Sequence, residues 1–205
     1  FTVPILYDKK NQKIVNNESS EILRILNSGF QKLAKGKFAN YDFYPTEKRE
    51  EIDSINEWIY HDINNGVYKC GFATSQSAYQ QASNSLYASL DRVEKILANQ
   101  RYLLKGGITE ADIRLFVTLA RFTEVYEVYF KTNKLSLREY PNIRGYCRDM
   151  YQAFDGRLGS TINMPHIKTH YYTSHPKLNH YAVIPEGPNC VKDFEGDFSD
   201  RVKLP

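Results

Sequence analysis

Apolar residues at helical spacing run through most of the chain, and this periodicity limits the fold more than any other feature. Between residues 45 and 172 the apolar positions recur every three or four residues in several stretches separated by short loops. Such stretches bury their apolar faces by packing on one another. The sequence therefore predicts a helical bundle over residues 45–172, with the segment 113–122, apolar on nearly all sides, as its buried central helix.

The start of this central helix carries two recognisable signals. Thr109 is placed to cap the helix while Asp112, three residues later, reaches back to the Thr109 amide, which is the pattern of a capping box. Ile108 just outside the helix and Ile113 just inside it fit a hydrophobic staple. We expect replacement of Thr109 or Asp112 by alanine to cost about 1 kcal/mol each.

The first 35 residues follow a different pattern. Residues 1–7 and 13–15 are short extended runs on either side of a polar turn, which predicts a β-hairpin. After them Asn17 is expected to cap a helix whose first turn holds Glu18. A two-stranded hairpin is not stable alone in water, so the pattern predicts one part of a larger sheet. The fold class is α+β.

These patterns divide the chain into four parts. Residues 1–35 form the hairpin and helix, 36–44 a linker, 45–172 the helical domain, and 173–205 a coil packed on that domain. Pro45 is expected at the first position of the next helix. The tail contains four prolines and no helical period, and we expect it to bury its apolar residues, which are Tyr181, Val183, Ile184 and Phe194.

Composition excludes several functions. The 27 basic and 24 acidic residues give a net charge of only +3, which argues against a nucleic-acid partner. No apolar run approaches the ~20 residues that cross a bilayer, and no leader is visible, so we expect no membrane partner. Cys70, Cys147 and Cys190 form no metal-ligand pair and no disulfide framework, which favours a reducing, cytoplasmic location.

Side chains capable of chemistry are mostly ambiguous when taken singly. Tyrosine and phenylalanine number 16 and 11, and a tyrosine serves in core packing as well as in a cleft for planar polar ligands. His166 and His170 share a helical spacing, with His175 nearby, but without other ligands they are a weak zinc signal, and we predict no metal. The basic residues Lys131, Lys134, Arg138, Arg144 and Arg148 are interpreted as solvated surface.

Several strings of the chain, taken together, carry a resemblance. "VPILYD", "NESSEI" and the helix start at Gly106–Ile113 resemble, in order and spacing, the last two strands, third helix and central helix of a glutathione transferase. The longer strings "NNGVYKCGFATSQSAY", "ITEADIRLFVTLARF", "YPNIRGYCRDMYQ" and "HIKTHYYTSH" resemble the glutathionyl-hydroquinone reductases, or xi class. The resemblance covers residues 1–188. It implies a glutathione transferase fold, with a partial thioredoxin-like domain before the helical domain, and a homodimer formed through the helical domain.

The resemblance also implies site residues. Val3 and the cis-proline Pro4 would bind the cysteinyl part of glutathione, with Glu18 and Ser19 at its γ-glutamyl end. Tyr68 and one or both of Tyr171 and Tyr172 would flank the hydroquinone ring of an aromatic glutathionyl conjugate. From the residues alone, an edge-strand proline, an acidic first helical turn and packed tyrosines remain open as alternatives. Glutathione is the implied co-substrate.

One feature of the family is absent from these 205 residues. Reductases of this kind attack through the cysteine of a Cys-Pro motif, and no Cys-Pro dipeptide occurs here. We expect the nucleophile in an upstream segment of a longer polypeptide, with loss of the catalytic half or use of Cys70 as alternatives. The implied activity is glutathione-dependent reduction of glutathionyl-hydroquinones through a mixed disulfide, releasing oxidised glutathione. The alternatives are an omega-like thiol transferase and a non-enzymatic binding module.

Overall fold

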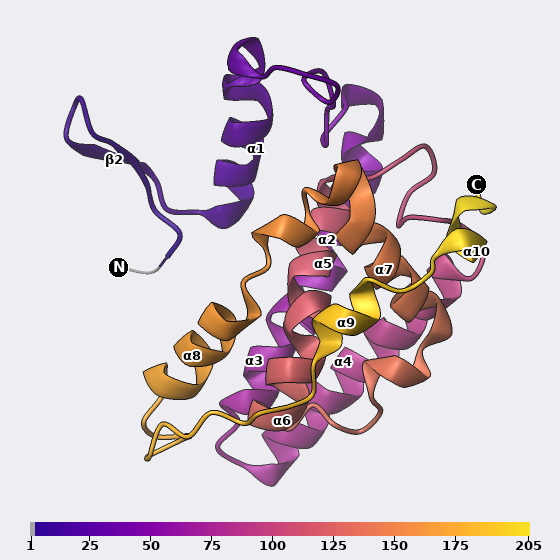
Figure 1. The fold of residues 1–205 in the computed structure, drawn as a ribbon. Coiled ribbons are helices and arrows are strands. Elements are labelled where there is room, and N and C mark those ends of the chain that lie inside the picture. Colours follow the sequence, from indigo (N-terminus) through magenta and orange to yellow (C-terminus); the bar gives the residue numbers. More distant parts are fainter. Residues whose placement is uncertain (1–2) are drawn as a thin grey trace.

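The computed structural model describes residues 3–205 and begins with a two-stranded antiparallel sheet (Figure 1). Strand β1 (Leu6–Asp8) pairs with β2 (Lys13–Asn16), with a register shift after Leu6. The Asp8 carboxylate accepts hydrogen bonds from the Lys10 and Asn11 amides and so closes the turn. The predicted hairpin is confirmed, although its first strand is shorter than expected. Phe1 and Thr2 of that expected strand lie outside the described residues.

Helix α1 (Ser19–Gly29) follows the hairpin directly, but its cap differs from the prediction. Glu18, not Asn17, occupies the N-cap position, and it makes no side-chain capping bond. The Asn17 amide group donates instead to the Pro4 carbonyl at 2.7 Å. The predicted Asn17 cap was wrong because this side chain ties the helix start to the residues before β1.

The remaining helices form a bundle in which α5 is central (Figure 1). Helix α5 packs against both α2 and α7. The helices of the bundle are α2 (Arg49–Ile59), α3 (Gly66–Gly71), α4 (Gln76–Leu97), α5 (Glu110–Arg121), α6 (Glu127–Tyr129), α7 (Pro141–Gly156) and α8 (Met164–Ser174).

Short turns of other helical types join these helices. Two π-helical turns, η3 (Tyr60–Asn64) and η4 (Phe122–Tyr126), interrupt the bundle. The 3-10 turns are η1 (Gln31–Leu33), η2 (Thr46–Lys48), η5 (Leu137–Glu139) and η6 (Gly159–Thr161). Pro45 lies just before η2, one position earlier than predicted. None of the described helices has the length and apolar character needed to span a bilayer.

The core of the bundle confirms α5 as its central element, with one difference. Leu115 and Leu119 of this helix are almost completely buried. Val117, however, is 46% exposed, so one side of α5 is open. An all-round apolar sequence therefore overestimates the burial of this helix. The boundaries predicted at residues 35, 44 and 172 stay predictions.

The predicted capping box at the start of α5 is present, and its carboxylate makes more contacts than expected. Asp112 accepts from the Thr109 amide at 2.8 Å and also from the Leu103 amide at 2.9 Å and the Tyr146 hydroxyl at 3.1 Å. The side chain is fully buried, and this burial raises its pKa. Ile108 is buried and Ile113 half-buried, both against the core. Asp112 thus fixes the loop before α5, the start of α5 and α7.

The C-terminal tail departs from the predicted coil in two respects. It forms two short helices, α9 (Cys190–Phe194) and α10 (Ser199–Val202). Of its apolar residues Phe194 is buried, whereas Tyr181 and Val183 are 83% and 67% exposed and Ile184 is 38% exposed. The prediction that all four would be buried was wrong.

Charge explains where the tail is anchored. The Asp193 carboxylate accepts hydrogen bonds from Arg144 and Arg148 on α7, and the bonds from Arg144 first, then Arg148, lower the pKa of Asp193 to about 2. These two arginines, interpreted from sequence as solvated surface, hold the tail instead. These ion pairs anchor the tail at α9. The apolar residues between 176 and 188 precede this anchor in the chain and are not held by it.

Replacing Asp112 with alanine removes the acceptor of four buried hydrogen bonds, which come from the Leu103 and Thr109 amides and the Thr109 and Tyr146 hydroxyls, and we expect it to lower the free energy of unfolding by about 3 kcal/mol. Urea denaturation measures this loss. The control is Asp200→Ala, whose carboxylate is almost fully exposed beside Lys203 and should contribute less than about 0.5 kcal/mol. Equal effects of the two substitutions would contradict the organising role of Asp112.

Candidate functional site

The first candidate binding surface lies where the hairpin meets α1. The Val3–Pro4 peptide bond is cis, as the resemblance implies. Val3 is exposed, and so are Glu18 and Ser19 at the start of α1. The bond from Asn17 to the Pro4 carbonyl brings these two segments together. An exposed backbone segment beside the amides of a helix start can hold a peptide-like ligand with a carboxylate.

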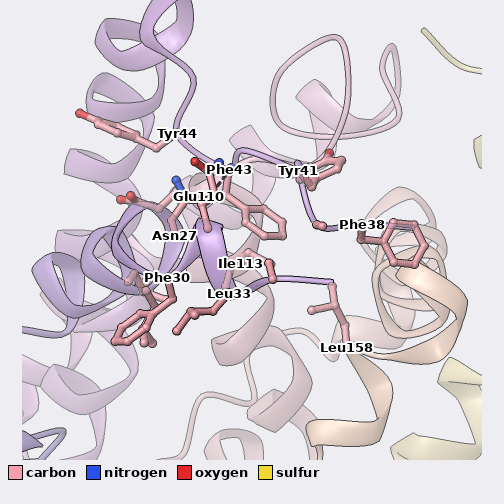
Figure 2. Close-up of a pocket in the computed structure, with 15 residues that line it drawn as sticks. Asn27, Phe30, Leu33, Phe38, Tyr41, Phe43, Tyr44, Glu110, Ile113 and Leu158 are labelled. Carbon is pink, nitrogen blue, oxygen red and sulfur yellow. Dashed lines mark hydrogen bonds between the residues drawn. The ribbon is translucent and has the colours of Figure 1, made fainter. Parts of the chain in front are cut away.

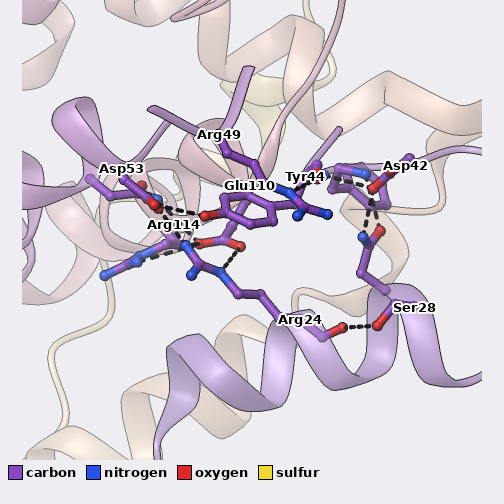
Figure 3. Close-up of polar contacts among 11 residues, drawn as sticks. Arg24, Ser28, Asp42, Tyr44, Arg49, Asp53, Glu110 and Arg114 are labelled. Carbon is purple, nitrogen blue, oxygen red and sulfur yellow. Dashed lines mark hydrogen bonds and ion pairs between the residues drawn. The ribbon is translucent and has the colours of Figure 1, made fainter. Parts of the chain in front are cut away.

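An ion-pair network joins α1 to the helical domain (Figure 3). Arg24 of α1 donates to Glu110 at the start of α5 at 3.0 Å and to Asp53 of α2 at 2.5 Å. The Arg24 guanidinium also lies 3.8 Å from the centroid of the Tyr44 ring. Glu110 is buried and receives a further bond from Asn56. This network fixes the orientation of α1, and with it the surface at Glu18 and Ser19.

Beside this network a cavity of about 580 Å³ opens between α1 and α5 (Figure 2). Its lining is largely apolar and includes Leu26, Phe30 and Leu33 together with Ile113 and Leu158. Leu26, Phe30 and Leu33 are also among the exposed large apolar side chains of the chain. The cavity offers few hydrogen-bonding groups, because Glu110 is already occupied by its ion pairs.

A cluster of three tyrosines forms the second candidate surface, at some distance in sequence from the first. Tyr68 of α3 and Tyr171 of α8 have their hydroxyl oxygens 2.5 Å apart, and the Tyr171 and Tyr126 hydroxyls are 2.8 Å apart. We call these three residues the tyrosine triad. Tyr68 is 38% exposed, whereas Tyr126 and Tyr171 are buried. The triad therefore reaches from the core to the surface.

Local backbone geometry makes this cluster possible. Tyr126 ends the π-helical turn η4, and such turns shift the direction of side chains in a helix. Gly71 lets α3 approach Phe130 closely, since a Cβ at this position would lie 2.3 Å from the Phe130 ring. The Phe130 ring in turn lies 5.2 Å from Tyr68 and 5.5 Å from Tyr126 between centroids. The triad thus packs against the buried Phe130 ring.

The three hydroxyls of the triad form a hydrogen-bonded chain in which one hydroxyl proton has no acceptor within the triad. Three hydroxyl groups have three protons, and the two contacts between them use two. If Tyr126 donates to Tyr171 and Tyr171 to Tyr68, the proton of the exposed Tyr68 is free for a ligand oxygen. Burial raises the pKa of Tyr126 and of Tyr171, so both remain neutral donors. The triad can bind a planar ring and stabilise negative charge on its oxygen.

The structure separates the two tyrosines that the sequence left undecided. Tyr171 joins Tyr68, whereas the Tyr172 hydroxyl donates to the Glu124 carbonyl at 3.0 Å in the core. Burial, followed by the charge of Glu124, raises the pKa of Tyr172 to about 12. Tyr172 therefore lies outside the triad, and its contact with a ring stays a prediction. Sequence reasoning missed Tyr126, because a π-helical turn leaves no periodic signal.

The three cysteines are free and buried, and burial disfavours the thiolate that a substitute nucleophile at Cys70 would need. Cys70 is 2% exposed, and burial raises its pKa to about 11. Burial raises the pKa of Cys147 as well, and that of Cys190 to about 12.

The histidines show how the face of α8 is built. The His175 ring nitrogen Nδ1 lies 3.1 Å from the Tyr171 carbonyl, and His170 lies near Ser174. Over residues 3–205 no group of three or more His, Cys, Asp or Glu side chains is arranged to hold a metal ion. The His175 contact thus lies within the last turn of α8, next to Tyr171 of the triad.

Comparison with known proteins gives consistent matches. Residues 76–149 match the family model of the glutathione S-transferase C-terminal domain. Over 187 residues the chain is 48% identical to the glutathionyl-hydroquinone reductase YqjG of Escherichia coli, covering 91% of this chain and 56% of that protein. It is 41% identical to an omega-like glutathione S-transferase of Saccharomyces cerevisiae, covering 92% and 56%. The chain thus spans just over half the length of these relatives.

Solved structures agree with the sequence matches. The glutathione-bound structure of YqjG superposes with a TM-score of 0.84 at 47% identity, covering 91% of this chain and 59% of that one. Glutathione transferase Xi 1 from Trametes versicolor superposes with a TM-score of 0.88 at 52% identity, covering 93% and 65%. The chain shares its fold with these proteins.

The burial of the thiols leads to a direct test. With a pKa of about 11, only about one thousandth of the Cys70 thiol is ionised at about pH 8. We expect iodoacetamide to leave Cys70, Cys147 and Cys190 unmodified in the native protein and to modify all three in guanidinium chloride. Peptide mass spectrometry measures both. Rapid native modification of Cys70 would restore it as a candidate nucleophile.

Proposed function

Because the chain has the glutathione transferase fold and is homologous to xi-class enzymes over more than nine-tenths of its length, we propose that the whole protein reduces glutathionyl-hydroquinones to hydroquinones with glutathione. The observation that carries the aromatic half of this proposal is the tyrosine triad, which presents a hydroxyl donor and ring faces at the surface. The YqjG relative, named a glutathionyl-hydroquinone reductase, supports the reaction class.

In this reaction a cysteine thiolate attacks the glutathionyl sulfur of the conjugate. The bond between that sulfur and the ring carbon breaks, the ring carbon takes up a proton, and the hydroquinone leaves. A second glutathione, as thiolate, attacks the resulting mixed disulfide and releases oxidised glutathione. The electrons that reduce the ring thus come from two thiols, and no metal takes part in any step.

We place the attacking cysteine outside these 205 residues, in an upstream part of the whole protein. The three thiols of this chain are buried, and the relatives extend well beyond the region they share with it. Exposed apolar side chains on the hairpin and α1 are suited to packing against further strands and helices of a thioredoxin-like domain. These side chains are Ile5, Tyr7, Ile14, Val15, Leu26, Phe30 and Leu33.

At the glutathione end the proposed contacts are those that the resemblance implies. The backbone of Val3, before cis-Pro4, would pair with the cysteinyl part of glutathione in the manner of an added strand. The amides at the start of α1 and the Ser19 hydroxyl would hold the γ-glutamyl carboxylate, and Glu18 its ammonium group. The glutathione-bound structure of YqjG supports this use of the fold.

At the aromatic end Tyr68 would donate its spare proton to the ring oxygen of the conjugate. Charge that develops on this oxygen as the carbon–sulfur bond breaks would be stabilised through the hydroxyl chain to Tyr171 and Tyr126. The exposed Phe72 ring lies parallel to Tyr68, with centroids 6.5 Å apart, and adds apolar surface. The aromatic site would thus combine ring contact with one directed donor.

Assembly and location are further expectations. We propose a homodimer formed through the helical domain, as the resemblance implies. A cytoplasmic location is supported by three free, unpaired thiols, which are typical of a reducing compartment.

The second candidate activity is a general glutathione-dependent thiol transfer, which the omega-like relative favours. Such an enzyme would use the glutathione end of the site but would not need the triad. The two activities therefore differ in their dependence on Tyr171.

Tyr171→Phe, made in the whole protein, removes the hydroxyl at the centre of the chain and should lower kcat/KM for a glutathionyl-hydroquinone by about 10- to 100-fold. Turnover of a small mixed disulfide of glutathione should remain unchanged. Tyr172→Phe is the matched control, since the hydroxyl that it loses lies outside the triad. Equal losses on both substrates in Tyr171→Phe would favour general thiol transfer instead.

A further inference from the structure

A buried ion pair lies directly behind the tyrosine triad. The Lys168 ammonium lies 3.3 Å from the Glu124 carboxylate, and the two residues are 9% and 1% exposed. Glu124 belongs to the π-helical turn η4, two residues before Tyr126. Lys168 belongs to α8, three residues before Tyr171 and on the same face of that helix. The pair thus joins the two segments that carry the buried tyrosines.

A second contact joins the same two segments. The Tyr172 hydroxyl of α8 donates to the backbone carbonyl of Glu124 at 3.0 Å. Glu124 is therefore held through its side chain by Lys168 and through its backbone by Tyr172. Movement of α8 away from η4 would break both contacts together with the hydrogen bond between Tyr126 and Tyr171.

The same two charges also hold the C-terminal tail. The Cys190 amide donates to Glu124 Oε1 at 2.7 Å, and Lys168 Nζ donates to the Glu186 carbonyl at 3.1 Å. Each charged group therefore contacts the other and one tail residue. The tail thus contacts the pair at Glu186 and at Cys190.

Stability alone does not account for this arrangement. Removing two charges from water costs about as much as their attraction returns, and apolar residues of similar volume often stabilise a core better. A buried pair of this kind does, however, hold its neighbours in one geometry, because any other arrangement leaves a charge buried without a partner. In this structure, a rearrangement of the triad or of the tail would therefore leave a buried charge without its partner.

We propose that the Glu124–Lys168 pair is a positioning element that keeps Tyr126 and Tyr171 in hydrogen-bond contact and couples this contact to the docked tail. For its effect on turnover this inference rests on the proposed function. Glu124 and Lys168 are positioning residues, which act on the substrate through the tyrosines. When the pair is broken, the tail loosens and the hydroxyl chain is interrupted.

The test uses the whole protein and the variant Lys168→Met, which removes the charge but keeps most of the stem. Three quantities are measured. The first is the kinetics of glutathionyl-hydroquinone reduction, as kcat and as the KM for glutathione. The second is the rate at which Cys190 is alkylated in the native protein. The third is the nuclear Overhauser effect between the isotope-labelled rings of Tyr126 and Tyr171, whose centroids lie 5.6 Å apart.

Arg101→Met provides the matched control. Arg101 pairs with Asp149, whose carboxylate is as buried as that of Glu124, and this pair is made by residues outside both candidate surfaces. Glu124→Gln is the second variant, because it removes the charge yet keeps an acceptor for the Cys190 amide. It keeps the test decisive if Lys168→Met fails to fold.

We expect Lys168→Met to lower kcat about tenfold while the KM for glutathione stays within about twofold. Alkylation of Cys190 should accelerate at least about tenfold, with Cys147 as an unchanged internal reference, and the ring-to-ring effect should weaken. Arg101→Met should lower the Tm without changing these quantities. If Lys168→Met and Glu124→Gln lower only the Tm, as Arg101→Met does, the proposal is overturned.

The outcomes also separate this inference from the proposed function. If the wild-type protein does not turn over glutathionyl-hydroquinones, the proposed function fails. The role of the ion pair is then tested by the alkylation rate of Cys190 and the nuclear Overhauser effect between the Tyr126 and Tyr171 rings. If either quantity is unchanged in both variants, the proposed role of the ion pair is overturned.

Discussion

Buried polar groups must find hydrogen-bond partners, and in this chain that requirement fixes most of the long-range geometry. Asp112 is fully buried and collects donors from a loop, its own helix start and α7. Glu110 and Glu124, at the start of α5 and just beyond its end, are satisfied by Arg24 and Lys168 from distant segments. The central helix is therefore held at both ends by side chains whose partners lie far away in sequence.

This distribution of buried charge connects the two candidate surfaces. Glu110 orients α1 and so the helix start at Glu18 and Ser19, while Glu124 lies behind Tyr126 and Tyr171. Both carboxylates belong to one continuous stretch, α5 and the turn that follows it (Figure 1). A ligand with a peptide-like end and an aromatic end would thus meet two surfaces positioned by the same helix. The cavity between α1 and α5 is largely apolar and is suited to packing instead (Figure 2).

The sequence predicts the helices and strands of this fold better than the side-chain contacts between them. Periodicity and the Thr109–Asp112 pattern predict the bundle and the start of its central helix, because those signals are local. Asn17, Arg144 and Arg148 were misassigned, since each acts on a partner that only the fold brings near. Resemblance indicated Tyr68 with one or both of Tyr171 and Tyr172, but neither spacing nor resemblance indicated Tyr126, which reaches the triad through a π-helical turn.

We propose that the aromatic part of the substrate binds at the tyrosine triad. The most direct measurement is a crystal structure of the whole protein with glutathione and a hydroquinone. We expect the ring to lie against Tyr68, with a ring oxygen within hydrogen-bond distance of its hydroxyl. A ring found in the apolar cavity between α1 and α5, with the triad unoccupied, would contradict it.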